Sequence, residues 1–429
     1  MDGRLEEVFV DVFTKRLAPT EIKGRNRSKT QAIQVGGATD MLGEPTGLEE
    51  FICRYIKLDD DAAPEECTTV GKYSDPRRDD PSRPAEWRLG YTNAQRVMTE
   101  LAKPGDHVWI MRLRKEPQKL VLVLAPAGSE VAKRLGRLMG TSLTAQDSLP
   151  EITTKEDFVR GDVISAGSSG IDFEDAELLE LLGVPLTIES PNLLDAALAR
   201  FARLPRAEVL SRFVRDELGL DPRDGVDEVF MAWNVVNDEV FFVLEEREVQ
   251  ATLNEHFAMQ ENIDVAQFFH VAKSRTNARF ARAGLSFESH LAAVFDAFGL
   301  RYVAQARKMV DGSKPDFLLP GLVEYSDDEL VHLTSFVGAK TTAKERWLQL
   351  KGEAVRVDHA FLATKDKAIA PATLKRMVIN AVYPVMAKPI IDEFYRGNAD
   401  LILTLADFIE EALQRQGQLD SIVGQRASY

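Results

Sequence analysis

Three charged residues in the C-terminal half of the chain could together hydrolyse a phosphodiester bond. Asp316 lies in KPDFLLP at the start of an expected strand, Lys340 ends the apolar strand in FVGAKTT, and Glu353 lies in the helix that follows. A lysine that ends a central strand needs an anionic partner, because an unpaired buried ammonium is strongly destabilising. Two carboxylates and an ammonium at one sheet edge would form an oxygen-ligated Mg²⁺ site, in which Lys340 positions or activates the attacking water.

The alternative is that Asp316 caps a turn and that Lys340 and Glu353 are ordinary surface charges. Spacing alone favours this alternative, because a Pro-Asp pair followed by a distant lysine is common by chance.

The elements that must position these residues change in type along the chain. Residues 1–140 contain β-rich runs separated by turn-forming residues, at VFVDVF, FICRYIKL, WRLGY, HVWIMRL and LVLVLAP, which favours a barrel or a sandwich. Residues 141–175 lose this period and include SAGSSG, a composition typical of a hinge. Residues 176–429 form the second domain, in which 191–275 predict a helical layer and 284–416 predict a central mixed sheet flanked by helices.

The composition of the 429-residue chain is that of a globular protein, with 45% hydrophobic and 28% charged residues. No apolar run is long enough to span a membrane, and the N-terminus lacks the pattern of a signal peptide, so we expect a cytoplasmic protein with no membrane partner. Two cysteines and six histidines without an HExxH spacing exclude the common zinc sites, which leaves oxygen ligands for any metal. The net charge of −15 argues against bulk coating of nucleic acid but leaves a local basic groove open.

The segments ARAGLSFESHL, KPDFLLP, GAKTTAKERW and GEA resemble the catalytic domain of EcoRII-type restriction endonucleases, a branch of the PD-(D/E)xK nucleases. The resemblance extends with gaps from about Val229 to Gln416 and includes the closing LTLADFIEEALQRQ. It implies a restriction-endonuclease-like α/β fold, with metal binding by Asp316 and Glu353 and catalysis by Lys340. It also implies an active-site acid at Glu288 in SFESHL and a nearby tyrosine at Tyr325 in VEYSDD. Without the family, Glu288 is equally typical of a solvent-facing helix residue, and Tyr325 is typical of loop packing.

A basic-acidic-basic triplet follows the catalytic lysine, at Lys344, Glu345 and Arg346. Arginine can donate two hydrogen bonds to guanine, and glutamate can accept one from cytosine, so such a triplet can read adjacent C·G pairs in the major groove. The resemblance implies that it contacts a CC·GG element, whereas the triplet alone is more typical of an exposed mixture of helix charges. Leu348 stands where the EcoRII pattern has another arginine, which leaves the central base of the site open.

The N-terminal segments FTKRLAPTEIKGRNRSKTQAIQV and YSDPRRDDPSRPAEWRLGY are similar to the effector DNA-binding domain of the same enzymes, a pseudobarrel also used by plant transcription factors. The resemblance implies two DNA-contacting arms, in which phosphate contacts position the duplex and a few side chains read bases. The alternative is two basic loops without a ligand. The residues of the first arm are Lys23, Arg25, Arg27, Lys29 and Gln31, and those of the second are Arg77, Arg78, Arg83, Glu86 and Arg88.

Together these patterns predict a Mg²⁺-dependent type II restriction endonuclease that cuts double-stranded DNA and leaves 5′-phosphates. The resemblance implies that the N-terminal domain binds a second DNA copy and occludes the catalytic cleft until that second copy is bound. Since two strands are cut by one site per chain, a homodimer is expected, and the family implies a cognate DNA methyltransferase. Two alternatives stay open: a nuclease triggered by modified DNA that the N-terminal domain senses, and a DNA-binding regulator with an inactive nuclease-like domain.

Overall fold

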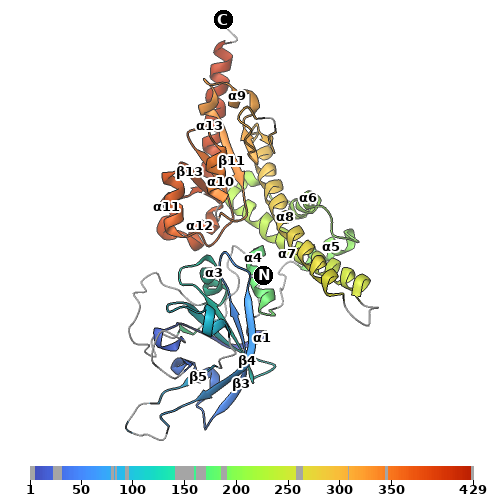
Figure 1. Ribbon diagram of the computed structural model, residues 1–429. Helices are drawn as coiled ribbons and strands as arrows, with labels where there is room; N and C mark the ends of the chain where they lie inside the picture. Colours follow the sequence, from blue (N-terminus) through green and yellow to red (C-terminus); the bar gives the residue numbers. More distant parts are fainter. Residues whose placement is uncertain are drawn as a thin grey trace. The chain divides into compact units, whose positions relative to one another are not determined.

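The computed structural model shows two compact units, each with its own sheet (Figure 1). Residues 2–166 and 175–187 form the N-terminal unit, and residues 167–174 and 188–429 form the C-terminal unit. The structure describes residues 5–22, 31–78, 82, 85–91, 96–140, 159–160, 171–184, 191–257, 264–307, 309–343 and 346–426.

An eight-stranded sheet, in the order β2-β5-β4-β3-β7-β6-β1-β8, is the core of the N-terminal unit. Its strands are β1 (Phe9–Arg16), β2 (Ala32–Gln34), β3 (Glu49–Lys57), β4 (Glu65–Ser74), β5 (Arg88–Gly90), β6 (His107–Leu113), β7 (Lys119–Ala125) and β8 (Val159–Arg160). Four short helices accompany them: α1 (Leu5–Val8), α2 (Thr39–Leu42), α3 (Glu130–Leu138) and α4 (Phe173–Leu181), the last of which begins in the other unit. The pairing of β3 with β7 is parallel, and the other pairings are antiparallel.

The five β-rich runs noted in the sequence correspond to β1, β3, β5, β6 and β7. The longest strand, β4, was not predicted, because EECTTVGKYS offers few apolar side chains and alternates between half-buried and exposed positions over most of its length. Its conformation is set by pairing with all nine residues of β3, which a local pattern cannot show. The prediction of a β-rich N-terminal part is confirmed.

The C-terminal unit contains a six-stranded mixed sheet in the order β14-β13-β12-β11-β10-β9. Its strands are β9 (Val303–Ala304), β10 (Phe317–Leu319), β11 (Ser335–Ala339), β12 (Ala360–Ala363), β13 (Val382–Met386) and β14 (Leu403–Thr404). Strands β11 to β14 run parallel to one another, whereas β10 pairs antiparallel with both β9 and β11. The expected mixed α/β architecture is confirmed.

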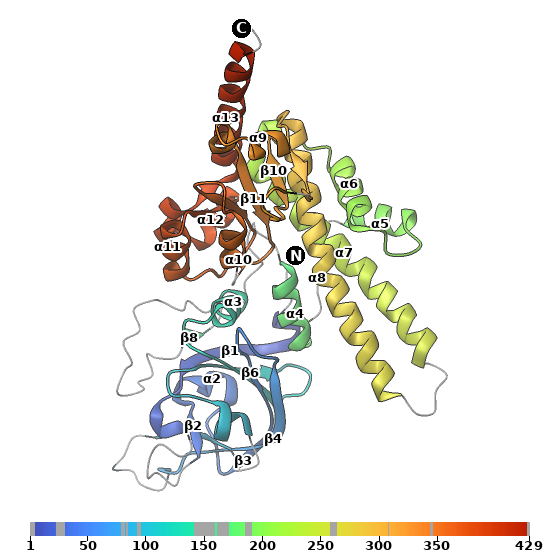
Figure 2. The same cartoon turned by 45° about the horizontal axis from the view of Figure 1, so that its top comes forward.

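Helices cover both faces of this sheet (Figure 2). The helices of this unit are α5 (Pro191–Arg200), α6 (Ala207–Leu218), α7 (Val226–Phe257), α8 (Val265–Ala297), α9 (Leu322–Ser326), α10 (Arg346–Glu353), α11 (Pro371–Ile379), α12 (Lys388–Phe394) and α13 (Leu405–Arg426), of which α5 and α6 pack on α7 and α8. Phe295 of α8 packs edge-on against Phe317 of β10, and Phe408 of α13 packs in the same way against Phe361 of β12. Because successive side chains of a strand point to opposite faces, Leu362 is directed to the other face, where α10 contacts β12.

The helical layer expected at 191–275 corresponds to α5, α6, α7 and the first third of α8, and the last two helices are 32 and 33 residues long. Asp227, in the first turn of α7, accepts hydrogen bonds from the backbone amides of Lys388, Leu405 and Ala406 at 2.9, 3.0 and 3.3 Å. One carboxylate therefore ties the starts of α12 and α13 to α7. In the part of the chain that the structure describes, no helix has the length and hydrophobicity needed to cross a membrane.

Candidate active site

Asp316 and Lys340 meet because two neighbouring strands run in opposite directions. Asp316 directly precedes β10, Lys340 directly follows β11, and Phe317 pairs with Val337 across the two strands. The Oδ2 atom of Asp316 accepts a hydrogen bond from the backbone amide of Ala339 at 2.7 Å and forms an ion pair with Nζ of Lys340, also at 2.7 Å. The Asp316 side chain is 11% exposed and that of Lys340 is 37% exposed, so the carboxylate is fixed and the ammonium remains accessible.

Glu288 joins this pair through the side chain of Gln305 (Gln305 follows β9, and Glu288 lies on α8). The Nε2 atom of Gln305 donates to Oε2 of Glu288 at 2.6 Å and to Oδ1 of Asp316 at 3.3 Å. Burial and the nearby charge of Asp316 raise the pKa of Glu288, while the Gln305 hydrogen bond and Lys340 act in the opposite direction. Glu288, Asp316 and Lys340, three of the five predicted catalytic residues, therefore lie in one cluster.

Glu353 and Tyr325 lie outside this cluster. Glu353 is the last residue of α10, and its Oε1 accepts a hydrogen bond from Gln349 at 3.2 Å. Tyr325, on α9, is fully buried, and its hydroxyl donates to Oδ2 of Asp311 at 2.6 Å. Among the described residues, no hydrogen bond or ion pair links either side chain to Asp316 or Lys340. Their predicted roles remain predictions.

The predicted recognition triplet falls at the start of α10, where Lys344 and Glu345 lie outside the described residues. Arg346 begins the helix and is exposed, with a hydrogen bond of 3.4 Å from its guanidinium to Gln349. The helix approaches β11 closely because Gly338 leaves room for Leu350, whose Cδ1 would lie 2.9 Å from an added Cβ atom.

The loop between β11 and α10 is held by the segment that follows β12. The buried Asp366 accepts hydrogen bonds from the amides of Ala343 and Ala368, both at 2.9 Å, and the hydroxyl of Thr364 donates to the carbonyl of Thr341 at 3.3 Å. Asp366 and Gln305 were not predicted as site residues. Each acts on a partner that is distant in sequence, so no local motif marks it.

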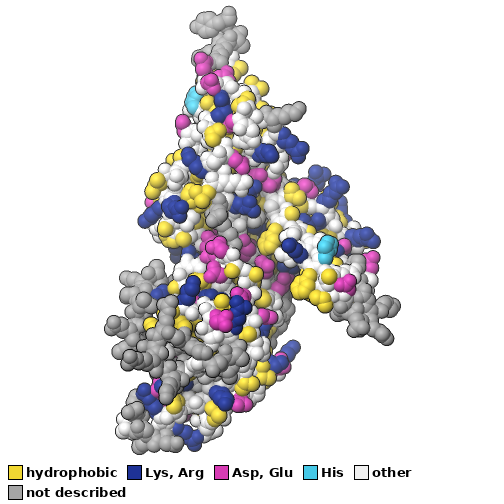
Figure 3. Space-filling model, viewed as in Figure 1, with side chains coloured by type: hydrophobic (Ala, Val, Ile, Leu, Met, Phe, Trp, Pro, Cys, Tyr) yellow, Lys and Arg dark blue, Asp and Glu magenta, His cyan; other side chains and the backbone are white. Residues whose placement is uncertain are grey.

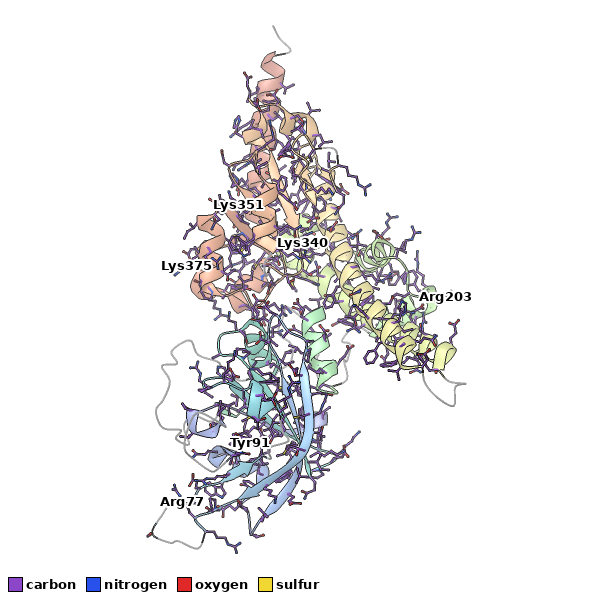
Figure 4. The ribbon with its side chains drawn as sticks, viewed as in Figure 1. Arg77, Tyr91, Arg203, Lys340, Lys351 and Lys375 are labelled. Carbon is purple, nitrogen blue, oxygen red and sulfur yellow. The ribbon has the colours of Figure 1, made fainter. Side chains whose placement is uncertain are left out.

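In the N-terminal unit, the structure describes only part of the two predicted arms. Lys23, Arg25, Arg27 and Lys29 of the first arm and Arg83 of the second lie outside the described residues. Glu86 pairs with Arg77 and with Arg88, each at 2.6 Å, and also accepts from Gln34. The backbone carbonyl of Gln31 accepts from Tyr91, and Arg78 is exposed; Arg77 and Tyr91 are labelled in Figure 4. The glutamate predicted in the second arm thus holds two of its arginines.

Two carboxylate oxygens in the cluster around Asp316 could contact the same small divalent cation. Oε2 of Glu288 and Oδ1 of Asp316 both lie within hydrogen-bonding distance of one nitrogen atom, so a cation near that position would contact both oxygens. Within the described residues, no group of three or more His, Cys, Asp or Glu side chains is arranged to hold a metal by itself. Mg²⁺ typically uses one or two carboxylates together with water and substrate phosphates, so two carboxylates are a suitable protein contribution.

Comparisons with known proteins find similarity to type II restriction enzymes. The family model described as "EcoRII C terminal" matches residues 241–409. The type II restriction enzyme EcoRII of Escherichia coli is 30% identical over 202 residues, 47% of this chain and 47% of that protein. The type II restriction enzyme SsoII of Shigella sonnei is 28% identical over 155 residues, 34% of this chain and 50% of that protein. Residues 241–409 therefore resemble the C-terminal domain of EcoRII, and the predicted resemblance to EcoRII-type restriction enzymes is confirmed.

Two solved structures are also similar to this chain. Metal-depleted Ecl18kI in complex with uncleaved, modified DNA covers 55% of this chain and 87% of its own, at 22% identity and a TM-score of 0.43. The complex of restriction endonuclease PspGI with substrate DNA covers 50% of this chain and 94% of its own, at 18% identity and a TM-score of 0.41. The chain spans about half the length of the curated relatives that it matches.

Proposed function

We propose that this chain is a Mg²⁺-dependent type II restriction endonuclease that hydrolyses double-stranded DNA at a short site containing C·G pairs. The observation that carries the proposal is the buried Asp316 carboxylate, which bonds Lys340 at 2.7 Å and shares the Gln305 amide with Glu288. Similarity to EcoRII and SsoII supports it independently of the geometry.

In the proposed reaction, the chain positions one phosphodiester group and one water molecule. Asp316 and Glu288 would hold the Mg²⁺ ion, and Glu353 remains a predicted further ligand. When bound, the ion would neutralise the phosphate and lower the pKa of a water molecule. The ammonium of Lys340, kept in place by Asp316, would orient the attacking water and stabilise the charge that develops on the phosphate oxygens. Cleavage would leave 5′-phosphate ends.

Contacts to the DNA backbone and to bases would come from different surfaces. Figure 3 shows Lys and Arg side chains gathered over α5 and α6, where Arg200, Arg203, Arg206 and Arg212 are exposed. Such a surface suits phosphate contacts despite the net charge of −15. Base readout would fall to the triplet Lys344, Glu345 and Arg346.

Replacing Arg346 by alanine should weaken discrimination at one base pair. Loss of a bidentate contact to guanine costs about 1 to 3 kcal/mol of discrimination at that position. Cleavage rates on oligonucleotides in which each base pair is replaced in turn would measure the effect. Lys351→Ala is the matched control, since Lys351 is exposed on the same helix (Figure 4) and its loss should affect all sequences alike or none. A uniform loss with Arg346→Ala would contradict base readout.

The N-terminal unit is proposed to be an effector DNA-binding module with the pseudobarrel fold of plant transcription factors, with residues 1–140 as the module and 141–175 as the hinge. Through it the enzyme would bind a second DNA copy and control access to the catalytic cleft. A homodimer with one catalytic site per chain would cut both strands of a near-palindromic site, and a cognate methyltransferase would protect the host DNA.

Cleavage of plasmid DNA with and without Mg²⁺ tests the proposal directly. Purified protein should convert diverse unmethylated plasmids into discrete linear fragments only when Mg²⁺ is present, and sequencing the fragment ends would give the site and the 5′-phosphates. Fragments from methylated plasmids alone would favour the modification-dependent alternative. DNA binding without Mg²⁺-dependent cutting of either plasmid would refute the nuclease proposal and favour a regulator with an inactive nuclease-like domain.

A further inference from the structure

We infer that Gln305 is a positioning residue that holds the Glu288 and Asp316 carboxylates at a separation where one divalent cation can bind both. The inference rests on the proposed function, because it concerns the site that would hold the metal ion. Gln305 belongs to none of the motifs noted in the sequence.

The side-chain amide of Gln305 makes one contact with each carboxylate. Its nitrogen lies 2.6 Å from Oε2 of Glu288 and 3.3 Å from Oδ1 of Asp316. An amide NH₂ group has two hydrogens, and both of its neighbours are carboxylate oxygens that accept hydrogen bonds. The contacts therefore use the full donor capacity of the group and fix its orientation, with the nitrogen toward the two acids.

The backbone of Gln305 is held as firmly as its side chain. Its amide donates to the carbonyl of Asp316 at 2.8 Å, so the residue is attached to the strand start that carries the catalytic carboxylate. Its φ of 49° lies in the left-handed region, which costs a residue with a side chain roughly 1 to 2 kcal/mol. Since Gln305 is exposed, burial of apolar surface does not offset this cost. The hydrogen bonds of its side chain to Glu288 and Asp316 are therefore the contacts that can offset the cost of the left-handed backbone.

These contacts compensate the repulsion between the two acids. Two carboxylates that face one point repel each other, and the Lys340 ammonium, which pairs with Oδ2 of Asp316, offsets only part of this repulsion. The NH₂ group of Gln305 carries a partial positive charge and contacts both carboxylates. A bound cation would contact the same oxygens with a full positive charge. Binding of the ion would then require the amide to move aside or to rotate its oxygen toward the ion, while the carboxylates keep their places.

Mn²⁺ binding to the full-length chain tests this role without requiring activity. In Gln305→Met, which keeps the side-chain length and removes the donors, the Kd for Mn²⁺ measured by electron paramagnetic resonance should rise about 10- to 100-fold, as is common for residues that orient metal ligands. Gln414→Met is the matched control, because Gln414 is an exposed glutamine whose Nε2 bonds a single carboxylate, that of Glu410, at 3.2 Å. The control should bind Mn²⁺ like the wild type.

Two further variants separate positioning from a purely structural role. Gln305→Gly should bind Mn²⁺ as weakly as Gln305→Met, yet unfold within about 2 °C of the wild type, because glycine adopts a positive φ without strain. Gln305→Glu places a third carboxylate in the cluster, so its unfolding temperature should fall without metal and recover when Mn²⁺ is added.

The outcomes distinguish failure of this inference from failure of the proposed function. If the wild type binds Mn²⁺ and both Gln305→Met and Gln305→Gly bind it equally well, the positioning role is wrong and the nuclease proposal stands. If the wild type binds no Mn²⁺ and cuts no DNA with Mg²⁺, both are wrong. Weaker Mn²⁺ binding in the two variants, with a Mg²⁺ requirement for cleavage that rises in parallel, supports the role.

Discussion

Lys340→Ala should lower the rate of Mg²⁺-dependent plasmid cleavage by about 10³-fold, the scale seen when a group that moves a proton or stabilises transition-state charge is removed. The physical reason is the place of its ammonium, 2.7 Å from a carboxylate that is itself fixed by a backbone amide. The loss should appear in single-turnover rates at saturating DNA, while the Kd for DNA changes little. Such a result would separate the chemical step from binding.

Lys375→Ala is the matched control for this experiment. Lys375 is an exposed lysine on α11, away from Lys340 in Figure 4, and its removal should leave the cleavage rate unchanged. Mn²⁺ binding and the unfolding temperature should be recorded for both variants, so that a folding defect is recognised as such. Cleavage by Lys340→Ala within tenfold of the wild-type rate would show that the lysine does not take part in the chemistry.

Lys365→Met should destabilise the C-terminal unit by about 3 to 5 kcal/mol, the usual cost of removing one partner from a buried ion pair. Nζ of Lys365, which follows β12, lies 2.5 Å from Oδ2 of Asp238 on α7, and the two side chains are 6% and 5% exposed. Burial raises the pKa of Asp238, and Lys365 counteracts that rise. Without the lysine, the carboxyl group would be buried without its cationic partner.

Urea denaturation combined with amide hydrogen exchange in α7 and β12 would measure this loss within the correct unit. Lys388→Met is the matched control, because Lys388 forms an ion pair with Asp392 whose side chains are 55% and 58% exposed. Its removal should cost less than about 1 kcal/mol. Adding Asp238→Leu to Lys365→Met should restore most of the stability, since neither member of this pair is then left buried without its partner. Equal losses for Lys365→Met and Lys388→Met would contradict the expected cost of burial.

The sequence predicted the kind of chemistry at the site better than it predicted which residues lie there. Asp316 and Lys340 could be placed at a strand start and a strand end because the flanking runs PDFLLP and LTSFVGAK are apolar and short. Glu288 was found only through the resemblance, since a glutamate on a helix carries no local signal of its partners. The roles of Glu353 and Tyr325 stay predictions of the resemblance, and in the structure their hydrogen-bond partners are Gln349 and Asp311.

Local patterns indicated the strands β1, β3, β5, β6 and β7 and the helical layer, because side-chain periodicity and turn residues act over a few neighbouring positions, but they did not indicate β4. Local patterns also placed Asp316 at a strand start and Lys340 at a strand end. The tertiary structure decided that β10 and β11 pair antiparallel, which brings Asp316 to Lys340, and that Gln305 joins Glu288 to Asp316. Those contacts depend on strand order, register and one left-handed backbone conformation, which arise from packing between segments far apart in the chain.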